Sequence, residues 1–161
     1  KLPNTGMVVT SDIGDVNDIH PKNKHEVGNR LALWALNKDY GFANTVYTGP
    51  LYEKISIEGQ QIRIYFEGIG SGLYSPDKLL NYFEVAGKNQ TYYPAKAFIE
   101  GNNVIVRSPK VKSPKSVRFG WTDTAIPNLF NKEGLPAASF SSEMMGIEGN
   151  QESKRQIRNN E

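Results

Sequence analysis

The spacing of apolar residues changes near residue 41, and this change divides the chain into two parts. From Lys24 to Lys38, apolar side chains recur every three or four residues, as they do on one face of a helix. These positions are Val27, Leu31, Trp34 and Ala35. Beyond Gly41, apolar and polar residues alternate, which is the period of a half-buried strand. The pattern therefore predicts one amphipathic helix that stops at Gly41, followed by a β-rich region.

Six strand-like runs, bounded by Gly, Pro and Asn, make up the β-rich region. They are residues 52–58, 61–67, 82–86, 92–99, 104–108 and 116–121. The first two predict a hairpin, because isoleucines alternate with polar residues in both runs and Gly59 and Gln60 provide the reversal. Short strands separated by turns predict a mainly β fold, an antiparallel β-sandwich of jelly-roll-like type.

An apolar run at residues 7–10 predicts one more strand ahead of the helix, and a polar loop follows it. The loop ends in Asp18, Ile19, His20 and Pro21. Pro21 suits the first turn of the helix, where its missing N–H would be unpaired anyway. His20 has a carboxylate two residues upstream, as the general base of a hydrolase needs. This loop is therefore the strongest candidate for catalytic chemistry.

Three carboxylates could orient the imidazole of His20. Asp18 is the nearest along the chain, but Asp15 or Asp12 could fold back to the same ring nitrogen, and a backbone carbonyl could take the role instead. The second histidine, His25, lies in the predicted helix and is interpreted as a solvated side chain.

The chain offers His20 no convincing nucleophile. It has no cysteine, and Ser71 is flanked directly by Gly70 and Gly72, whereas a nucleophile elbow has its glycines two residues away. The glycine-rich run at residues 68–72 is interpreted as a turn. Two histidines cannot build a histidine-rich zinc site, and no EF-hand loop is present. We therefore expect no metal and no cofactor.

Charge and hydropathy restrict the partners. Nineteen basic and seventeen acidic residues leave a net charge of +2, and the lysines are scattered, so binding of nucleic acid is not expected. No apolar run is long enough to span a bilayer, so no membrane association is expected. The lysine-rich stretch at residues 109–115 could attract an anionic partner, but it is interpreted as a solvated loop between strands.

Seven stretches, taken in their order, resemble a known family. They are DIHPKNK at residues 18–24, RLALWAL at 30–36, YG at 40–41, GPLY at 49–52, GSGL at 70–73, FEVAG at 83–87 and NLFNKEGLP at 128–136. Together they resemble the C-terminal part of bacterial sialate O-acetylesterases, which belong to the SGNH-hydrolase superfamily. The resemblance covers roughly residues 7–140, and its specificity comes from the order and extent of the stretches.

The resemblance implies an esterase that removes acetyl groups from sugar hydroxyls with a serine nucleophile, a histidine base and an aspartate. His20 would be the base. Asp18 would be the acid, because the resembling sequences also carry it beside the histidine. Many SGNH enzymes place the aspartate three residues before the histidine, where this chain has Asn17. The serine would lie outside this chain, so the chain alone is expected to be inactive.

The resemblance also implies a division of the chain. Residues 1–41 would end an SGNH esterase domain, residues 42–145 would form an accessory β-sandwich, and residues 146–161 would be a disordered tail. The expected partners are an acetylated sugar, such as sialic acid or a related glycan, and the N-terminal SGNH portion of the same enzyme. The implied location is periplasmic or extracellular.

A non-catalytic carbohydrate-binding module is the alternative, because aromatic side chains in the β region could stack on sugar rings. These residues are Tyr82, Tyr92, Tyr93, Trp121 and Phe130.

Overall fold

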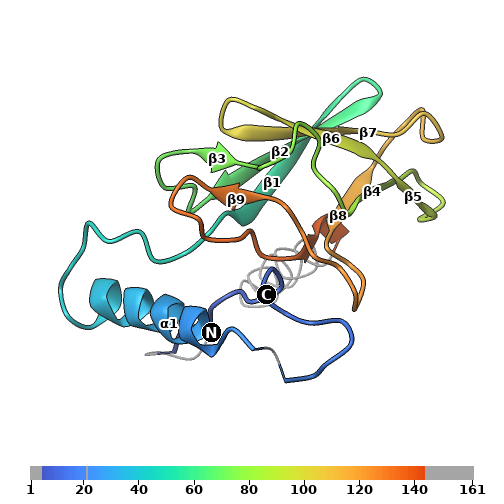
Figure 1. Cartoon of the computed structure of the whole chain (residues 1–161). Coiled ribbons are helices and arrows are strands. Elements are labelled where there is room, and N and C mark those ends of the chain that lie inside the picture. Colours follow the sequence, from blue (N-terminus) through green and yellow to red (C-terminus); the bar gives the residue numbers. More distant parts are fainter. Residues whose placement is uncertain (1–4, 21, 144–161) are drawn as a thin grey trace, which may run out of the picture.

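The computed structural model describes residues 5–20 and 22–143, and Figure 1 shows one helix beside a β domain. Helix α1 spans Lys24–Lys38. The strands are β1 (Leu51–Glu58), β2 (Gln61–Glu67), β3 (Leu73–Tyr74), β4 (Phe83–Ala86), β5 (Tyr92–Pro94), β6 (Lys96–Glu100), β7 (Asn103–Arg107), β8 (Ser116–Phe119), β9 (Phe130–Asn131) and β10 (Phe140–Ser141). Pro21 and the predicted tail at residues 146–161 lie outside the described residues.

Two four-stranded antiparallel sheets enclose one core. Their strand orders are β1-β2-β7-β6 and β10-β8-β4-β5, and β3 and β9 form a separate pair. Alternate side chains from both sheets fill the space between them, as sandwich packing requires. The buried members include Ile62, Ile64, Val104 and Val106 from the first sheet and Val85, Val117, Phe119 and Phe140 from the second. The predicted mainly β, antiparallel sandwich is confirmed.

The predicted hairpin is confirmed as β1 and β2. Ile57 pairs with Ile62 across the two strands, and Glu58 pairs with Gln61 at the turn. Gly59 has a φ of 62°, a left-handed conformation that glycine adopts without a Cβ clash. Ile62 points into the core and is fully buried, whereas Ile57 is partly exposed on the edge strand.

The single strand predicted at residues 92–99 is wrong. The segment divides at Pro94 and Ala95 into β5, which pairs with β4, and β6, which pairs with β7 in the other sheet. Pro94 has no N–H to donate to a ladder, and the Ala95 N–H donates to the Phe83 carbonyl at 2.9 Å. The chain therefore crosses from one sheet to the other within an apparently continuous apolar pattern.

The strand predicted at residues 7–10 is also wrong. This segment contains no strand, because a strand needs a neighbour to pair with and none of the three sheets in the described residues extends to it. The Val9 carbonyl instead accepts a hydrogen bond from Arg30 Nη1 at 2.6 Å. Side-chain contacts, and not a ladder, hold this segment in place.

Helix α1 has the predicted bounds, but its buried face differs from the predicted one. Leu31 is 50% exposed, whereas Arg30 is 3% exposed. The side chain of Asn23 caps the helix by accepting a hydrogen bond from the Glu26 N–H at 3.2 Å. The helix therefore begins at Lys24. In the described part of the chain, no helix has the length and apolar character that crossing a membrane requires.

The connection after α1 is fastened at both ends. Near the helix, Asn37 Nδ2 donates to the carbonyls of Ala43 and Thr45 at 3.0 and 2.9 Å. At the β domain, the fully buried Asn131 donates from Nδ2 to the Thr48 carbonyl at 3.0 Å and accepts at Oδ1 from the Leu135 N–H at 2.9 Å. These buried hydrogen bonds fix the connection against the turn after β9.

Candidate active-site loop

Asp18 and His20 meet in the loop before α1. His20 Nδ1 lies 3.3 Å from Asp18 Oδ1, and the same oxygen accepts a hydrogen bond from the His20 backbone N–H at 2.9 Å. A carboxylate that accepts from the N–H two residues on forms a local turn. The imidazole remains 80% exposed and the Asp18 side chain 44% exposed. The loop therefore orients an accessible imidazole through Nδ1.

The other two candidate acids have different partners. Asp15 Oδ1 accepts from the Asn17 N–H at 2.9 Å, and the Asp15 carbonyl accepts from the Asp18 N–H at 3.3 Å. Both oxygens of Asp12 contact Arg30, at 2.7 Å each. The structure thus brings Asp18, and neither Asp12 nor Asp15, to the ring of His20.

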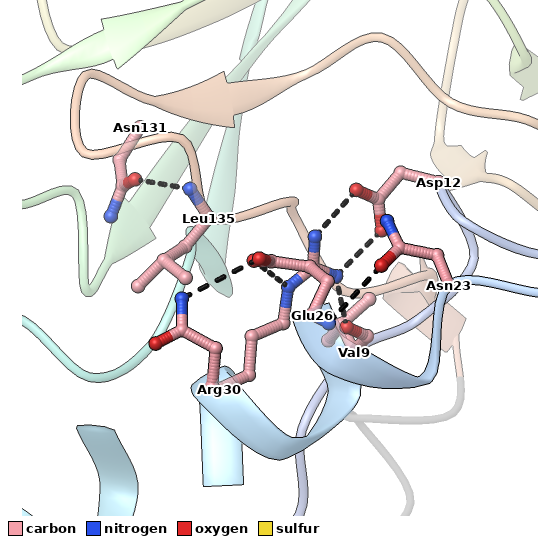
Figure 2. Close-up of polar contacts among 8 residues, drawn as sticks. Val9, Asp12, Asn23, Glu26, Arg30, Asn131 and Leu135 are labelled. Carbon is pink, nitrogen blue, oxygen red and sulfur yellow. Dashed lines mark hydrogen bonds and ion pairs between the residues drawn. The ribbon is translucent and has the colours of Figure 1, made fainter. Parts of the chain in front are cut away.

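Arg30 connects this loop segment to the helix. Figure 2 shows its guanidinium between Asp12, Glu26 and the Val9 carbonyl. Arg30 Nε donates to Glu26 Oε1 at 3.0 Å, so the pair also joins successive turns of α1. The hydrogen bonds that Arg30 donates to Asp12 raise the pKa of Arg30; burial opposes this effect, and the attraction of both carboxylates supports it. This buried cation therefore stays charged and ties the start of the His20 loop to α1.

Sequence reasoning did not identify Arg30 as a buried residue of the helix. A signal was available, because Arg30 follows Val27 by three residues and precedes Trp34 by four, which puts all three on one face. A charged residue on an otherwise apolar face needs a partner when it is buried. The sequence alone could not identify Asp12 as that partner, since eighteen positions separate the two residues.

A small hollow lies between the loop and the β domain. The loop contributes Ser11, Gly14, Asp15 and Val16, and the opposite wall comes from Gly120, Thr122, Asp123, Ala125, Ile126 and Ser139. Its volume is about 200 Å³. The hydroxyl of Ser11 is buried and has no hydrogen-bond partner among the described residues. Hydroxyl and carboxylate residues from three separate segments, residues 11–16, 120–126 and Ser139, line this hollow, and His20 is not among them.

Ser71, the serine weighed as a nucleophile, serves the fold of the β domain. Its N–H donates to both carboxylate oxygens of Glu133, at 2.9 and 3.2 Å. Hydrogen bonds from Ser71, first from its side chain and then from its backbone, lower the pKa of Glu133 against the opposing effect of burial. No group of three or more His, Asp or Glu side chains in the described ranges is arranged to hold a metal ion.

Similarity to solved structures extends over most of the chain. A carbohydrate acetylesterase from Xanthomonas citri matches 81% of this chain with a TM-score of 0.76 and 40% sequence identity. The match spans 30% of that enzyme's chain. No family model matches.

Curated relatives match a shorter stretch. Sialate O-acetylesterases from Homo sapiens and Pongo abelii are 43% identical to this chain over 61 residues, and the enzyme from Mus musculus is 41% identical over the same length. The match to the human and Pongo enzymes covers 35% of this chain and 12% of theirs. The predicted resemblance to sialate O-acetylesterases is confirmed, whereas the specification of bacterial enzymes stays a prediction. All of these proteins are enzymes, so they do not favour a non-catalytic module.

Proposed function

From its sialate O-acetylesterase-like sequence and carbohydrate-acetylesterase-like structure, we propose that the chain is the C-terminal part of a carbohydrate O-acetylesterase with His20 as its general base. The observation that carries the proposal is the contact of Asp18 with His20 Nδ1, in a chain 40% identical to a carbohydrate acetylesterase. The proposed substrate is an acetylated sugar, either sialic acid or a related glycan. The proposed location is periplasmic or extracellular.

The geometry suits a base that works through Nε2. Asp18 engages Nδ1 and the backbone N–H of the same residue, so Nε2 is left for the reaction. A serine Oγ attacks the acetyl carbonyl while Nε2 takes its proton, and the tetrahedral intermediate then collapses as Nε2–H protonates the departing sugar oxygen. Water deacylates the serine by the same proton transfers, releases acetate and restores the neutral imidazole. Asp18 is a positioning residue, since it acts through His20.

The attacking serine would come from an upstream portion of the same enzyme. Exposed apolar side chains support this proposal, because six large ones lie on the segment before the loop, the loop, α1 and the residues that follow it. They are Met7, Val16, Ile19, Leu31, Tyr40 and Phe42. Ile19, immediately before His20, is 90% exposed. An upstream domain packed against this part of the chain would cover such side chains and bring its serine to His20.

Under this proposal residues 1–41 complete the esterase domain, and residues 42–145 form an accessory β-sandwich. The hollow beside the loop would receive part of the sugar. Its 200 Å³ falls below the roughly 300–1,000 Å³ of sites for drug-sized ligands, so it suits a single sugar ring. The unpartnered Ser11 hydroxyl would hydrogen-bond to that ring.

The test compares the two histidines in the complete enzyme that carries this chain. His20→Ala should lower kcat on an acetylated sialoside at least about a thousandfold, as loss of a triad base does. His25→Ala is the matched control, since His25 lies exposed on α1, and it should leave kcat within about twofold. Retention of most activity in His20→Ala would remove His20 from the mechanism.

The variant Asp18→Asn tests whether Asp18 positions the His20 ring or is instead needed for folding. It should lower kcat by at least about tenfold while KM and the melting temperature stay unchanged, because the exposed side chain keeps an oxygen that can accept from the His20 backbone N–H but loses its negative charge beside the ring. The chain by itself should not hydrolyse 4-nitrophenyl acetate. Hydrolysis that depends on His20 would mean that residues 1–161 contain the nucleophile.

A further inference from the structure

Six cationic side chains gather at one end of the β-sandwich. They are Lys88, Lys96, Arg107, Lys110, Lys112 and Lys115, and all are exposed. They come from the β4–β5 turn, the start of β6, the end of β7 and the β7–β8 connection. Figure 1 draws these segments at the end of the sandwich away from α1. We call these six residues the basic face.

The β7–β8 connection that carries three of these lysines is anchored in the fold. Val111 is buried in the core, and its N–H donates to the Ser108 carbonyl at 3.1 Å. The Ser108 hydroxyl donates to the Pro94 carbonyl at 2.8 Å. At the other end, the Lys115 N–H donates to the Ala86 carbonyl at 2.8 Å. The stems of these exposed lysines therefore project from a backbone that hydrogen bonds hold in place.

Two hollows lie on the basic face and share Lys112. The first, of about 420 Å³, includes Lys96, Arg107 and Lys112 in its lining. The second, of about 440 Å³, is lined by Lys88, Lys110, Lys112 and Lys115 around Tyr93. Each volume falls within the range of small-ligand sites. Adjoining hollows of this size can hold consecutive residues of a polymer.

The cations of the basic face lack neutralising carboxylates. None of the six forms an ion pair within the described residues, whereas Arg30, Arg63 and Arg118 each do. Glu58 is the one acidic residue that lines either hollow, and it is occupied by Arg63 Nε at 2.6 Å. Like charges gathered in a hollow produce a local positive potential that attracts anions.

Tyr93 adds a feature that points to a sugar. Lys110 Nζ lies over one face of its ring, 5.5 Å from the centroid, so the second hollow combines an aromatic ring with a cation. A pyranose can pack its C–H groups on such a ring while its carboxylate meets the ammonium. The neighbouring Tyr92 is already covered by the Arg118 guanidinium, 4.1 Å from its ring centroid.

We propose that the basic face binds a carboxylate-bearing polysaccharide, a second glycan site apart from the His20 loop. The choice of glycan rests on the proposed esterase function. The proposal narrows the substrate class to acidic glycans. The basic face would hold such a glycan while the His20 loop acts on its acetyl groups. Single-stranded nucleic acid is the less fitting polyanion, because its binding sites present successive aromatic platforms and the two hollows contain one.

To measure the binding affinity, the full chain is titrated with polysialic acid and the heat released on binding is recorded. Binding should weaken steeply between about 50 mM and about 300 mM salt, and neutral dextran should not bind. Lys110→Glu/Lys112→Glu should weaken binding at least about tenfold. The matched control is Lys78→Glu/Lys132→Glu, which makes the same change in net charge at exposed positions outside both hollows, and it should change affinity less than about threefold. Tyr93→Leu keeps an apolar side chain and should weaken binding at least about threefold.

Three outcomes would overturn the proposal: no binding of polysialic acid, equal losses in the two double variants, or equally tight binding of single-stranded DNA. Melting curves of every variant separate lost binding from lost folding. In the complete enzyme, Lys110→Glu/Lys112→Glu should raise KM for a polymeric acetylated substrate while kcat/KM on 4-nitrophenyl acetate is unchanged. Because binding is measured without hydrolysis, failure of the esterase proposal and failure of this site give different results.

Discussion

Replacing Asp12 with alanine tests whether the ion pair with Arg30 fastens the start of the His20 loop to α1. Both Asp12 oxygens lie 2.7 Å from guanidinium nitrogens, and Arg30 is 3% exposed. In Asp12→Ala the guanidinium stays buried, with Glu26 and the Val9 carbonyl as its remaining acceptors. The variant therefore leaves a buried charge that is only partly compensated.

The expected loss in the free energy of unfolding follows from this geometry. Removing one partner of a buried ion pair destabilises a protein by roughly 3–5 kcal/mol. Two acceptors remain and the Asp12 side chain is 11% exposed, so we expect a loss of about 3 kcal/mol in the free energy of unfolding. Asp12→Asn keeps an acceptor oxygen and should cost about 1–2 kcal/mol. In Asp12→Leu/Arg30→Met both charges are absent, so this variant should be more stable than Asp12→Ala.

Urea unfolding measures these differences. Far-ultraviolet circular dichroism reports on α1, and Trp34 fluorescence in a Trp121→Phe background reports on the same helix. Asp123→Ala is the control, because Asp123 is exposed and forms no ion pair among the residues described, and it should change stability by less than about 0.5 kcal/mol. Equal unfolding free energies for Asp12→Ala and Asp123→Ala would refute the role of the ion pair.

Two further predictions concern the β domain and the helix. The pKa of Glu133 is lowered from 4.5 by hydrogen bonds from Ser71, so its carboxylate stabilises the fold above the unfolded pKa and the effect is lost as the pH falls through the folded pKa. Glu133→Gln should therefore melt below the wild type at neutral pH and together with it in strong acid; a constant difference would contradict this assignment. A Cβ at Gly49 would clash with the Pro136 carbonyl, while one at Gly28 meets open space. Gly49→Ala should destabilise the protein by about 1–3 kcal/mol, and Gly28→Ala should stabilise it by up to about 1 kcal/mol; equal melting temperatures would count against the close contact.

The fold could be predicted where one local pattern dominates. The hairpin of β1 and β2 and the bounds of α1 were predictable, because each keeps a single period over seven or more residues. The crossing at Pro94 was not, because the apolar alternation continues through it while the hydrogen-bond partners change sheets. Strands β3, β9 and β10 have two residues each, too few for any period to be visible. Their positions are decided by tertiary contacts.

The candidate site was predictable in its short-range part. Asp18 and His20 are two residues apart, so a local turn is sufficient to join them. The Arg30 ion pair and the far wall of the hollow depend on contacts between segments that are distant in sequence. Neither feature was predicted from the sequence. The basic face was visible as a lysine-rich stretch at residues 109–115. Lys88, Lys96 and Arg107 join it only through the sheet topology.

The role of His20 as the base of a serine esterase is tested most directly by labelling the complete enzyme with a fluorophosphonate, which reacts with activated serines. Peptide mass spectrometry should find the label on a serine upstream of residue 1. The labelling rate should fall at least about a hundredfold in His20→Ala and stay unchanged in His25→Ala. A label within residues 1–161, or a His20→Ala enzyme that reacts at the wild-type rate, would contradict the account.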